Sequence, residues 1–187
     1  MVFSVLLAVA MVVLIVRRCE CAVPDPDGVI GLKWRDSIET VQQKAGSAKW
    51  TLLEQTPPPD QSLKYEGQCF GQMGWIVPHF INNELYLIVL AFNSVTSLEA
   101  IHADLMRILT EKYGAATVLE GAFHDYRWNT ENVEVRLFYI KSGEFGTTSS
   151  LYLTYSYESI MTHVHAEAEK DRMVKEQERL DIMKNEL

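Results

Sequence analysis

Residues 84–114 show the clearest hydrophobic pattern of the chain, an apolar strand followed by an amphipathic helix. Residues 85–92 are apolar throughout, which predicts a strand covered on both faces, because a strand with one exposed face would alternate apolar and polar residues. Residues 96–99, Thr-Ser-Leu-Glu, form a capping box that predicts a helix start. Apolar residues then recur at helical spacing up to Gly114, which predicts a left-handed helix stop.

The same capping pattern predicts a second helix nearer the N-terminus. Residues 36–39 repeat the capping box, and Ile38, Val41 and Ala45 form a helical stripe that we expect to end at Gly46. Five further segments have the composition and the flanking turn residues of strands. They are residues 63–68, 71–81, 123–128, 132–140 and 149–157.

These elements follow one another as a helix, three strands, a helix and three strands. Asn82-Asn83 is expected to join the second and third strands, and short apolar runs at residues 50–53 and 115–119 follow the two helices. The order predicts an α+β fold. In this fold, two diverged α-β-β-β halves form an antiparallel sheet with helices on one face, plus a C-terminal helix.

The N-terminal end differs from this central part. Residues 1–16 are an apolar run that suits a signal peptide but is short for a membrane span of about 20 residues, and Arg17 and Arg18 follow it instead of preceding it. A cleaved signal, an uncleaved anchor and a start codon placed too early are all open. We expect a periplasmic or membrane-anchored protein, although the positive-inside rule would hold an anchored domain on the cytoplasmic side.

The composition divides the chain into four parts. These are residues 1–22, the signal peptide or membrane anchor; residues 23–28, a turn-rich linker; residues 29–158, the α+β domain; and residues 159–187, a charged helix. In the last part Met173, Leu180 and Leu187 lie seven residues apart. This narrow seam fits either a solvated helix packed by one edge or a partner-binding arm.

The net charge of −8 over 187 residues, without a basic cluster, argues against nucleic acid as a partner. Cys19, Cys21 and Cys69 fit neither a disulfide scaffold nor a zinc site. Cys69 is expected to be a buried apolar residue, and a disulfide to Cys19 or Cys21 in an oxidising compartment is the alternative. Residues 184–187, Lys-Asn-Glu-Leu, are either a retrieval signal of the endoplasmic reticulum or a chance match.

The sequence contains no glycine-rich phosphate loop, nucleophile elbow or zinc-protease motif. His163 and His165 lie two positions apart on a predicted helix, so their side chains would face different ways and would not form a metal pair. The sequence therefore predicts no catalytic, cofactor-binding or metal-binding residues, and a protein that is not an enzyme.

Several aromatic residues fall on predicted strands. Strand tyrosines and tryptophans often pack in a core, whereas aromatic residues on an open sheet face form a protein-binding surface. Both interpretations are kept. The candidate protein-contact residues are Trp75, Trp128, Tyr139, Tyr152 and Tyr155.

Residues 31–41 resemble the opening of a group of small exported bacterial proteins, in which a Trp-Gly-x-Ser pattern starts a capped helix ending in glycine; Arg35 stands at the glycine position here. Together with residues 112–114, Trp128 and residues 151–155, this makes the chain from about residue 29 to 157 similar to tandem-repeat domains of the β-lactamase-inhibitor-protein-like fold. The resemblance implies a noncatalytic envelope domain that binds proteins through its sheet.

These features together predict a noncatalytic exported or envelope-associated domain that binds a protein through the sheet face opposite the helices. Residues 85–92 motivate this prediction, because helices would cover only one face of that strand and the C-terminal helix, a second copy or another protein would cover the other. The alternative is a small-ligand carrier or enzyme with a pocket between sheet and helix. Such a pocket would hold His79 or His124 near a carboxylate.

Overall fold

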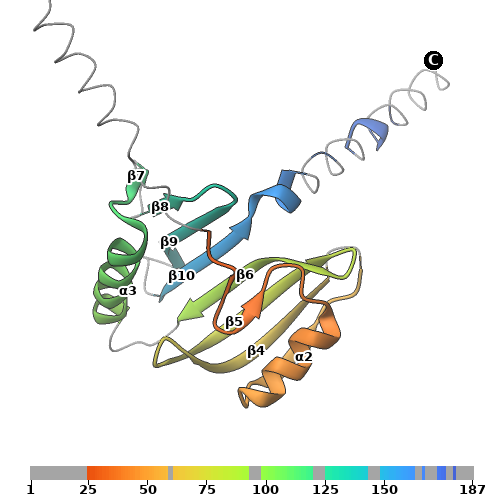
Figure 1. Cartoon of the computed structure of the whole chain (residues 1–187), viewed down its shortest axis with the longest axis horizontal. Helices are drawn as coiled ribbons and strands as arrows, with labels where there is room; N and C mark the ends of the chain where they lie inside the picture. Colours follow the sequence, from red (N-terminus) through yellow and green to blue (C-terminus); the bar gives the residue numbers. More distant parts are fainter. Residues whose placement is uncertain are drawn as a thin grey trace, which may run out of the picture.

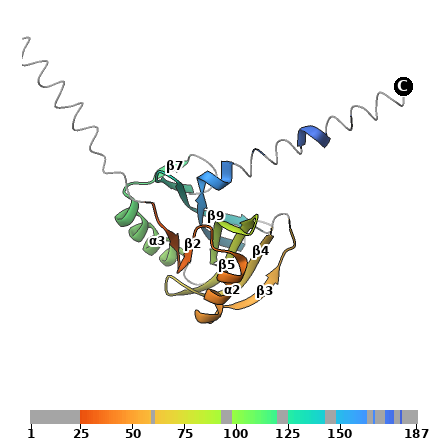
Figure 2. The ribbon, with the colours of Figure 1, turned by 45° about the vertical axis from the view of Figure 1, so that its right-hand side comes forward.

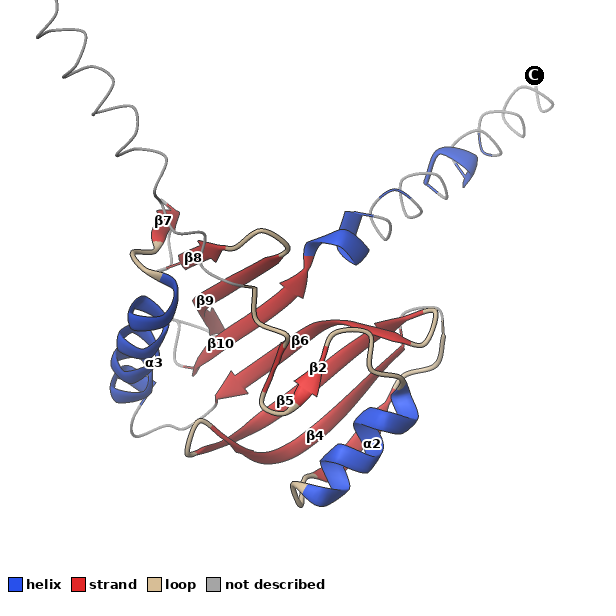
Figure 3. Ribbon diagram, in the orientation of Figure 1, coloured by secondary structure: helices blue, strands red, loops and turns tan. Residues whose placement is uncertain are grey.

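The computed structural model shows a mixed α+β fold built on a large antiparallel sheet (Figures 1 and 3). It describes residues 25–58, 61–92, 98–119, 125–142, 148–162, 166, 172–175 and 179. The apolar run of residues 1–16 lies outside these residues. Among the described helices, none is long and apolar enough to cross a membrane.

In the part of the chain that the structure describes, the two longer helices and ten strands make up the fold, and a helical segment at residues 158–162 follows them. In chain order they are β1 (Gly28–Val29), β2 (Leu32–Lys33), α2 (Ile38–Ser47), β3 (Thr51–Gln55), β4 (Gln61–Cys69), β5 (Gln72–Ile81), β6 (Glu84–Phe92), α3 (Leu98–Tyr113), β7 (Thr117–Leu119), β8 (Asp125–Asn129), β9 (Val133–Ser142) and β10 (Thr148–Tyr157). The strands β1 and β2 form a small hairpin, and the other eight form one sheet.

The eight-stranded sheet has the order β3-β4-β5-β6-β10-β9-β8-β7, and all of its neighbouring strands are antiparallel. The segment from α2 to β6 supplies one half of this order, and the segment from α3 to β10 supplies the other, with β6 and β10 paired at the centre. The antiparallel sheet predicted from the sequence is therefore confirmed. Each helix is followed by four strands instead of three, because the apolar runs at residues 50–53 and 115–119 form the edge strands β3 and β7.

The start of α2 differs from the predicted capping box by one residue. Ser37 is the N-cap, and its hydroxyl accepts a hydrogen bond from the backbone N–H of Thr40 at 3.3 Å. The Asp36 carboxylate instead accepts hydrogen bonds from the Lys33 backbone N–H at 2.7 Å and from Lys44 Nζ at 2.5 Å. Asp36 therefore stabilises the turn before the helix, and Ser37 is the capping residue.

The end of α2 also lies beyond the predicted stop at Gly46. The helix continues to Ser47, and Lys49 takes the left-handed conformation with φ of 59°. The Trp50 backbone N–H donates to the Ala45 carbonyl at 2.9 Å, which closes the helix end. In contrast, Gly114 ends α3 as predicted, with φ of 83°.

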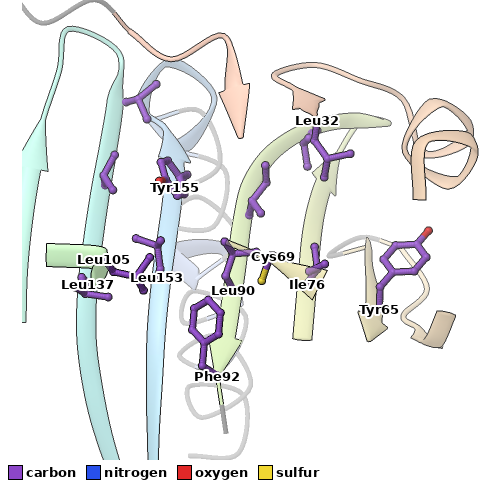
Figure 4. Close-up of a cluster of buried hydrophobic side chains, with 14 of the residues drawn as sticks. Leu32, Tyr65, Cys69, Ile76, Leu90, Phe92, Leu105, Leu137, Leu153 and Tyr155 are labelled. Atoms are coloured by element: carbon purple, nitrogen blue, oxygen red, sulfur yellow. The ribbon is translucent and has the colours of Figure 1, made fainter. Parts of the chain in front are cut away.

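One core fills the space between the sheet and the helices (Figure 4). Side chains that alternate along the strands join it, among them Ile88, Leu90 and Phe92 of β6, each 0% exposed. On the other face of β6, Leu87 and Val89 are only half-buried. The strand is therefore fully covered on one face and partly covered on the other, where the prediction from its sequence expected full cover on both.

The chain from residue 25 to 36, here called the N-terminal strap, belongs to the fold. Its hairpin of β1 and β2 lies between α3 and α2 (Figures 1 and 2), and its Leu32 side chain is 1% exposed in the core. The Asp25 carboxylate accepts a hydrogen bond from the Asn132 backbone N–H at 2.9 Å. The predicted linker, residues 23–28, is thus structured from residue 25 onward, because the Asp25 carboxylate accepts hydrogen bonds from residues that are distant in the chain.

The charged C-terminal helix is described only in part. Residues 158–162, 166, 172–175 and 179 are helical, and Ile160 is 7% exposed. Met173 is 65% exposed, so this part of the predicted seam has no cover from the described residues. Leu180 and Leu187, together with the terminal Lys-Asn-Glu-Leu, lie outside the described residues.

Candidate functional site

The sheet face that points away from the core, here called the open face, carries a row of aromatic side chains. Strand register aligns Trp75 of β5 with Ala91 of β6, Ala91 with Tyr152 of β10, and Tyr152 with Phe138 of β9. The three aromatic residues are half-buried, and the small Ala91 separates the first from the other two. Trp75, Tyr152 and Phe138 together form a feature that we call the aromatic band.

The ring faces of the aromatic band are occupied by their own neighbours. Phe138 and Tyr152 stack with ring centroids 5.4 Å apart and planes inclined by 14°. The Arg136 guanidinium lies 4.7 Å from the Phe138 centroid, and Lys64 Nζ lies 4.1 Å from the Trp75 centroid. Each such cation–π contact contributes about 0.5–1 kcal/mol at an exposed site. The band therefore offers partly exposed rings backed by cations, and not a flat platform of free ring faces.

Ion pairs border the aromatic band on the side of β8 and β9. Arg136 Nε donates to the Asp125 carboxylate at 2.8 Å, and this hydrogen bond raises the pKa of the guanidinium. Arg127 and Glu134 form a second pair at 3.0 Å. Because each of these cations has an acidic partner, the border adds directional hydrogen-bonding groups without adding net charge.

Three of the predicted contact aromatics lie on the core side of the sheet. Trp128 is 3% exposed and donates its indole N–H to the Gly114 carbonyl at 2.9 Å. Tyr155 is 2% exposed, and its burial raises the pKa of its hydroxyl. Tyr139 donates its hydroxyl to the Leu98 carbonyl at 3.2 Å. Trp128 and Tyr139 hold the two ends of α3 against the sheet and Tyr155 lies in the core, which corrects the prediction that these three form a contact surface with Trp75 and Tyr152.

Strand parity explains both this correction and the omission of Phe138 from the predicted set. In β9 and β10 the core side is taken by Val135, Leu137, Leu151 and Leu153, all 0% exposed. Tyr139 and Tyr155 share their parity, whereas Phe138 and Tyr152 have the opposite parity. The alternation of apolar residues along residues 132–140 was therefore the signal that could have identified Phe138.

An open cavity of about 480 Å³ lies between the strap and α2. It lies beside the helix end and does not include His79, which is on the open face opposite Leu87. Its ionisable lining residue, Lys44, is paired with Asp36 at 2.5 Å. The lining residues include Ile30, Gly31, Gln43, Lys44, Ser47 and Trp50.

The remaining candidate chemistry is placed as follows. Cys69 is 4% exposed, as expected for an apolar role, and burial raises the pKa of its thiol to about 11. His102 of α3 lies between the rings of Tyr126 and Tyr139, with centroids 5.4 Å and 5.1 Å away. Within the described part of the chain, no three His, Cys, Asp or Glu side chains gather in a way that could hold a metal ion. Cys19, Cys21, His124, His163 and His165 are outside the described residues.

Comparisons with protein-family models, with curated proteins and with solved structures find no match to this chain. The resemblance to the β-lactamase-inhibitor-protein-like fold therefore stays a prediction based on the motifs quoted above. The candidate site is accordingly defined by its own geometry.

Proposed function

We propose that this protein is a noncatalytic protein-binding domain and that the open face is its binding surface. The aromatic band is the observation that carries the proposal. Trp, Tyr and Arg are the residue types that contribute most binding energy at protein interfaces, particularly when polar groups surround them. Here Trp75, Tyr152 and Arg136 lie on one face, beside ion pairs at its border.

The stacking geometry favours a protein over other partners. Single-stranded nucleic acid and planar ligands bind to free ring faces, whereas Phe138 and Tyr152 stack on each other and Lys64 lies over Trp75. The net charge of −8 also disfavours a phosphate backbone. A protein can instead contact ring edges and the cationic groups beside them.

The order of the elements supports the same proposal at the level of the fold. We infer that the segment from α2 to β6 and the segment from α3 to β10 are diverged copies, with the helices covering one face of the shared sheet. The resemblance noted above is to tandem-repeat domains that bind proteins through their sheet. A single core shared by both helices and both sets of strands fits this interpretation.

We also propose that the domain is exported or held at a membrane by the segment before the strap. The fold adds a limit to any processing of that segment, because Asp25 takes part in tertiary hydrogen bonds. Mass spectrometry of the native protein should therefore find a mature N-terminus at or before residue 25. A mature chain that starts after residue 25 would contradict this expectation.

Site-specific photo-crosslinking in native cells tests the binding surface. A photoreactive phenylalanine analogue at position 138 keeps an aromatic ring in the band, and the same analogue at Val118, which is 59% exposed on β7, is the matched control. We expect a discrete crosslinked product at position 138, none at position 118, and loss of the product when Trp75→Ala is added.

The mass of the product identifies the partner. A product of twice the mass of the mature chain would show a second copy, and any other discrete mass would show a different protein. Equal crosslinking at both positions, or none at position 138, would contradict the proposed surface.

A small-ligand carrier is the second candidate, and the cavity beside Trp50 favours it. Its volume of about 480 Å³ lies in the range of ordinary ligand pockets. A ligand there should protect the Trp50 and Ser47 amides from hydrogen exchange and leave the aromatic band unaffected. Screening by ligand-observed NMR with Trp50→Ala as control separates the two candidates.

A further inference from the structure

Asn132, in the turn between β8 and β9, binds both ends of the described domain. Its backbone N–H and its side-chain amide donate to the Asp25 carboxylate at 2.9 Å and 2.5 Å. Thr130 donates its hydroxyl to the same carboxylate. The Asn132 carbonyl in turn accepts a hydrogen bond from the Glu158 backbone N–H at 2.8 Å. One residue thus contacts the first residue of the strap and the first residue of the C-terminal helix.

Trp34 makes a second connection between the same two segments. Its ring stacks on Tyr157, the last residue of β10, with centroids 5.8 Å apart and planes inclined by 13°. Its indole N–H donates to the Pro26 carbonyl at 2.7 Å, which ties the ring to the start of the strap. The Arg35 guanidinium lies 5.9 Å from the Tyr157 centroid. The residue just before the helix is therefore held by two strap side chains.

We propose that residues 25–34 of the N-terminal strap and the start of the C-terminal helix, residues 158–162, form one cooperative unit, in which loosening of one part loosens the other. In this unit, displacement of Asp25 is passed to Glu158 through Asn132 and to Tyr157 through Trp34. A pull on the segment before Asp25, or its binding elsewhere, then loosens the base of the C-terminal helix. This coupling links the two ends of the described domain.

The backbone of the strap carries conformational strain that favours opening of this unit. Ile30 and Arg35 have φ of 51° and 66°, in the left-handed region that costs a non-glycine residue about 1 kcal/mol or more. Gly28 has no room for a side chain, since a Cβ there would lie 1.8 Å from the Leu32 carbonyl oxygen. The contacts of Asp25 and Trp34 offset this strain, so losing either set favours the open state.

Hydrogen exchange measured by mass spectrometry on the full chain tests the coupling. In Asp25→Ala we expect exchange about tenfold faster both at residues 28–34 and at residues 158–162, because several hydrogen bonds to a charged group are lost. Exchange in β5, and in β6 from Leu87 onward, should be unchanged; the Leu85 N–H is left out of this comparison because it donates to the Asp36 carbonyl of the strap. Asp27→Ala is the matched control. It removes a carboxylate two residues from Asp25, and the Asp27 side chain is exposed.

A variant at the other end of the unit tests the coupling without changing Asp25. Since coupling between two sites acts in both directions, Tyr157→Ala should speed exchange at residues 28–34 as well as at its own position. Thr130→Val removes one of the hydrogen bonds to Asp25, together with the two that the Thr130 hydroxyl makes with the Val133 backbone, and should speed exchange in the same two segments and at the turn itself.

Two outcomes would overturn the proposal. The first is faster exchange confined to residues 28–34 in Asp25→Ala, which would make the strap independent of the helix. The second is faster exchange throughout β5 and β6, which would mean that the strap opens only when the whole domain unfolds.

Discussion

Lys49 occupies a backbone conformation that glycine adopts at least cost. Its φ of 59° places it at the left-handed position just after α2, where natural helices most often have glycine. We expect Lys49→Gly to raise the free energy of unfolding by about 0.5–1 kcal/mol in urea titrations. Ser47→Gly, two residues earlier and inside the helix, should lower it by up to about 1 kcal/mol. Equal destabilisation by both variants would show that position 49 does not require a left-handed conformation.

Asp25 gives the strap a pH dependence whose sign follows from its hydrogen bonds. Partial burial raises the pKa of this carboxyl group, but hydrogen bonds from Thr130 and Asn132 outweigh burial and hold the pKa below its ordinary value of 3.8. The contribution to stability is therefore fully present above about pH 4 and is lost as the pH falls through the lower folded-state pKa. The stability difference between wild type and Asp25→Asn should be constant from pH 7 to 5 and shrink below pH 4. A difference independent of pH would contradict this.

At the scale of elements, Gly67 of β4 has no room for a side chain, whereas Gly46 of α2 does. A Cβ on Gly67 would lie 2.3 Å from Trp50 Cδ1, whereas a Cβ on Gly46 meets nothing within 4 Å. Gly67→Ala should displace the Trp50 ring and lower the free energy of unfolding by about 1–3 kcal/mol. Gly46→Ala should raise it by about 0.8–1 kcal/mol, because Gly46 lies inside the helix instead of ending it. Chemical denaturation of both variants measures the contrast, and stabilisation by Gly67→Ala would refute the close contact.

The strap decides where the domain begins. A chain that starts at residue 25 keeps the Asp25 carboxylate, whereas one that starts at residue 29 loses it together with the Pro26 carbonyl that binds Trp34. We expect the shorter chain to be less stable by about 1–3 kcal/mol, since charged hydrogen bonds are lost. Thermal unfolding of the two truncated proteins, with the full chain as reference, measures the difference. Equal stability of the two truncated proteins would mean that the domain begins at residue 29.

Most elements were predictable because their signals are local. The hairpin turn at Asn82-Asn83 is present with φ of 50° and 64°, and α3 stops at Gly114. The strands β3 and β7 were not predicted as strands, since all of β3 is exposed and β7 has only three residues, which leaves little apolar alternation to read. Pairing with β4 and β8 makes these runs strands, and pairing is not a local property.

At the scale of the whole molecule, the two faces of the sheet should respond differently to the same substitution. Trp128 is 3% exposed in the core, whereas Trp75 is half-buried on the open face. Trp128→Ala should lower the free energy of unfolding by about 3–5 kcal/mol, because it leaves a large cavity. Trp75→Ala should lower the free energy of unfolding by about 1 kcal/mol or less, in addition to the loss of its cation–π contact with Lys64. Calorimetry of both variants measures this, and similar losses would place Trp75 in the core.

The candidate site was predictable only in part. Trp75 and Tyr152 were in the predicted set and lie on the open face, whereas Trp128 and Tyr155 are core residues. Aromatic residues on neighbouring strands look alike in the sequence, because the direction of each side chain depends on the register of its strand. A shift of one residue in β9 would exchange Phe138 and Tyr139 between the two faces.

The sequence by itself determined the helices α2 and α3, the strands β4, β5, β6, β8, β9 and β10, and the turn at Asn82-Asn83, because caps, turn residues and apolar alternation act over a few neighbouring residues. Only the tertiary structure decided which aromatic residues share the open face, and that both ends of the domain meet at Asn132. Asp25 and Asn132 are 107 residues apart in the chain. No local preference can specify such a contact, because it forms only when the paired strands bring the turn between β8 and β9 next to the strap.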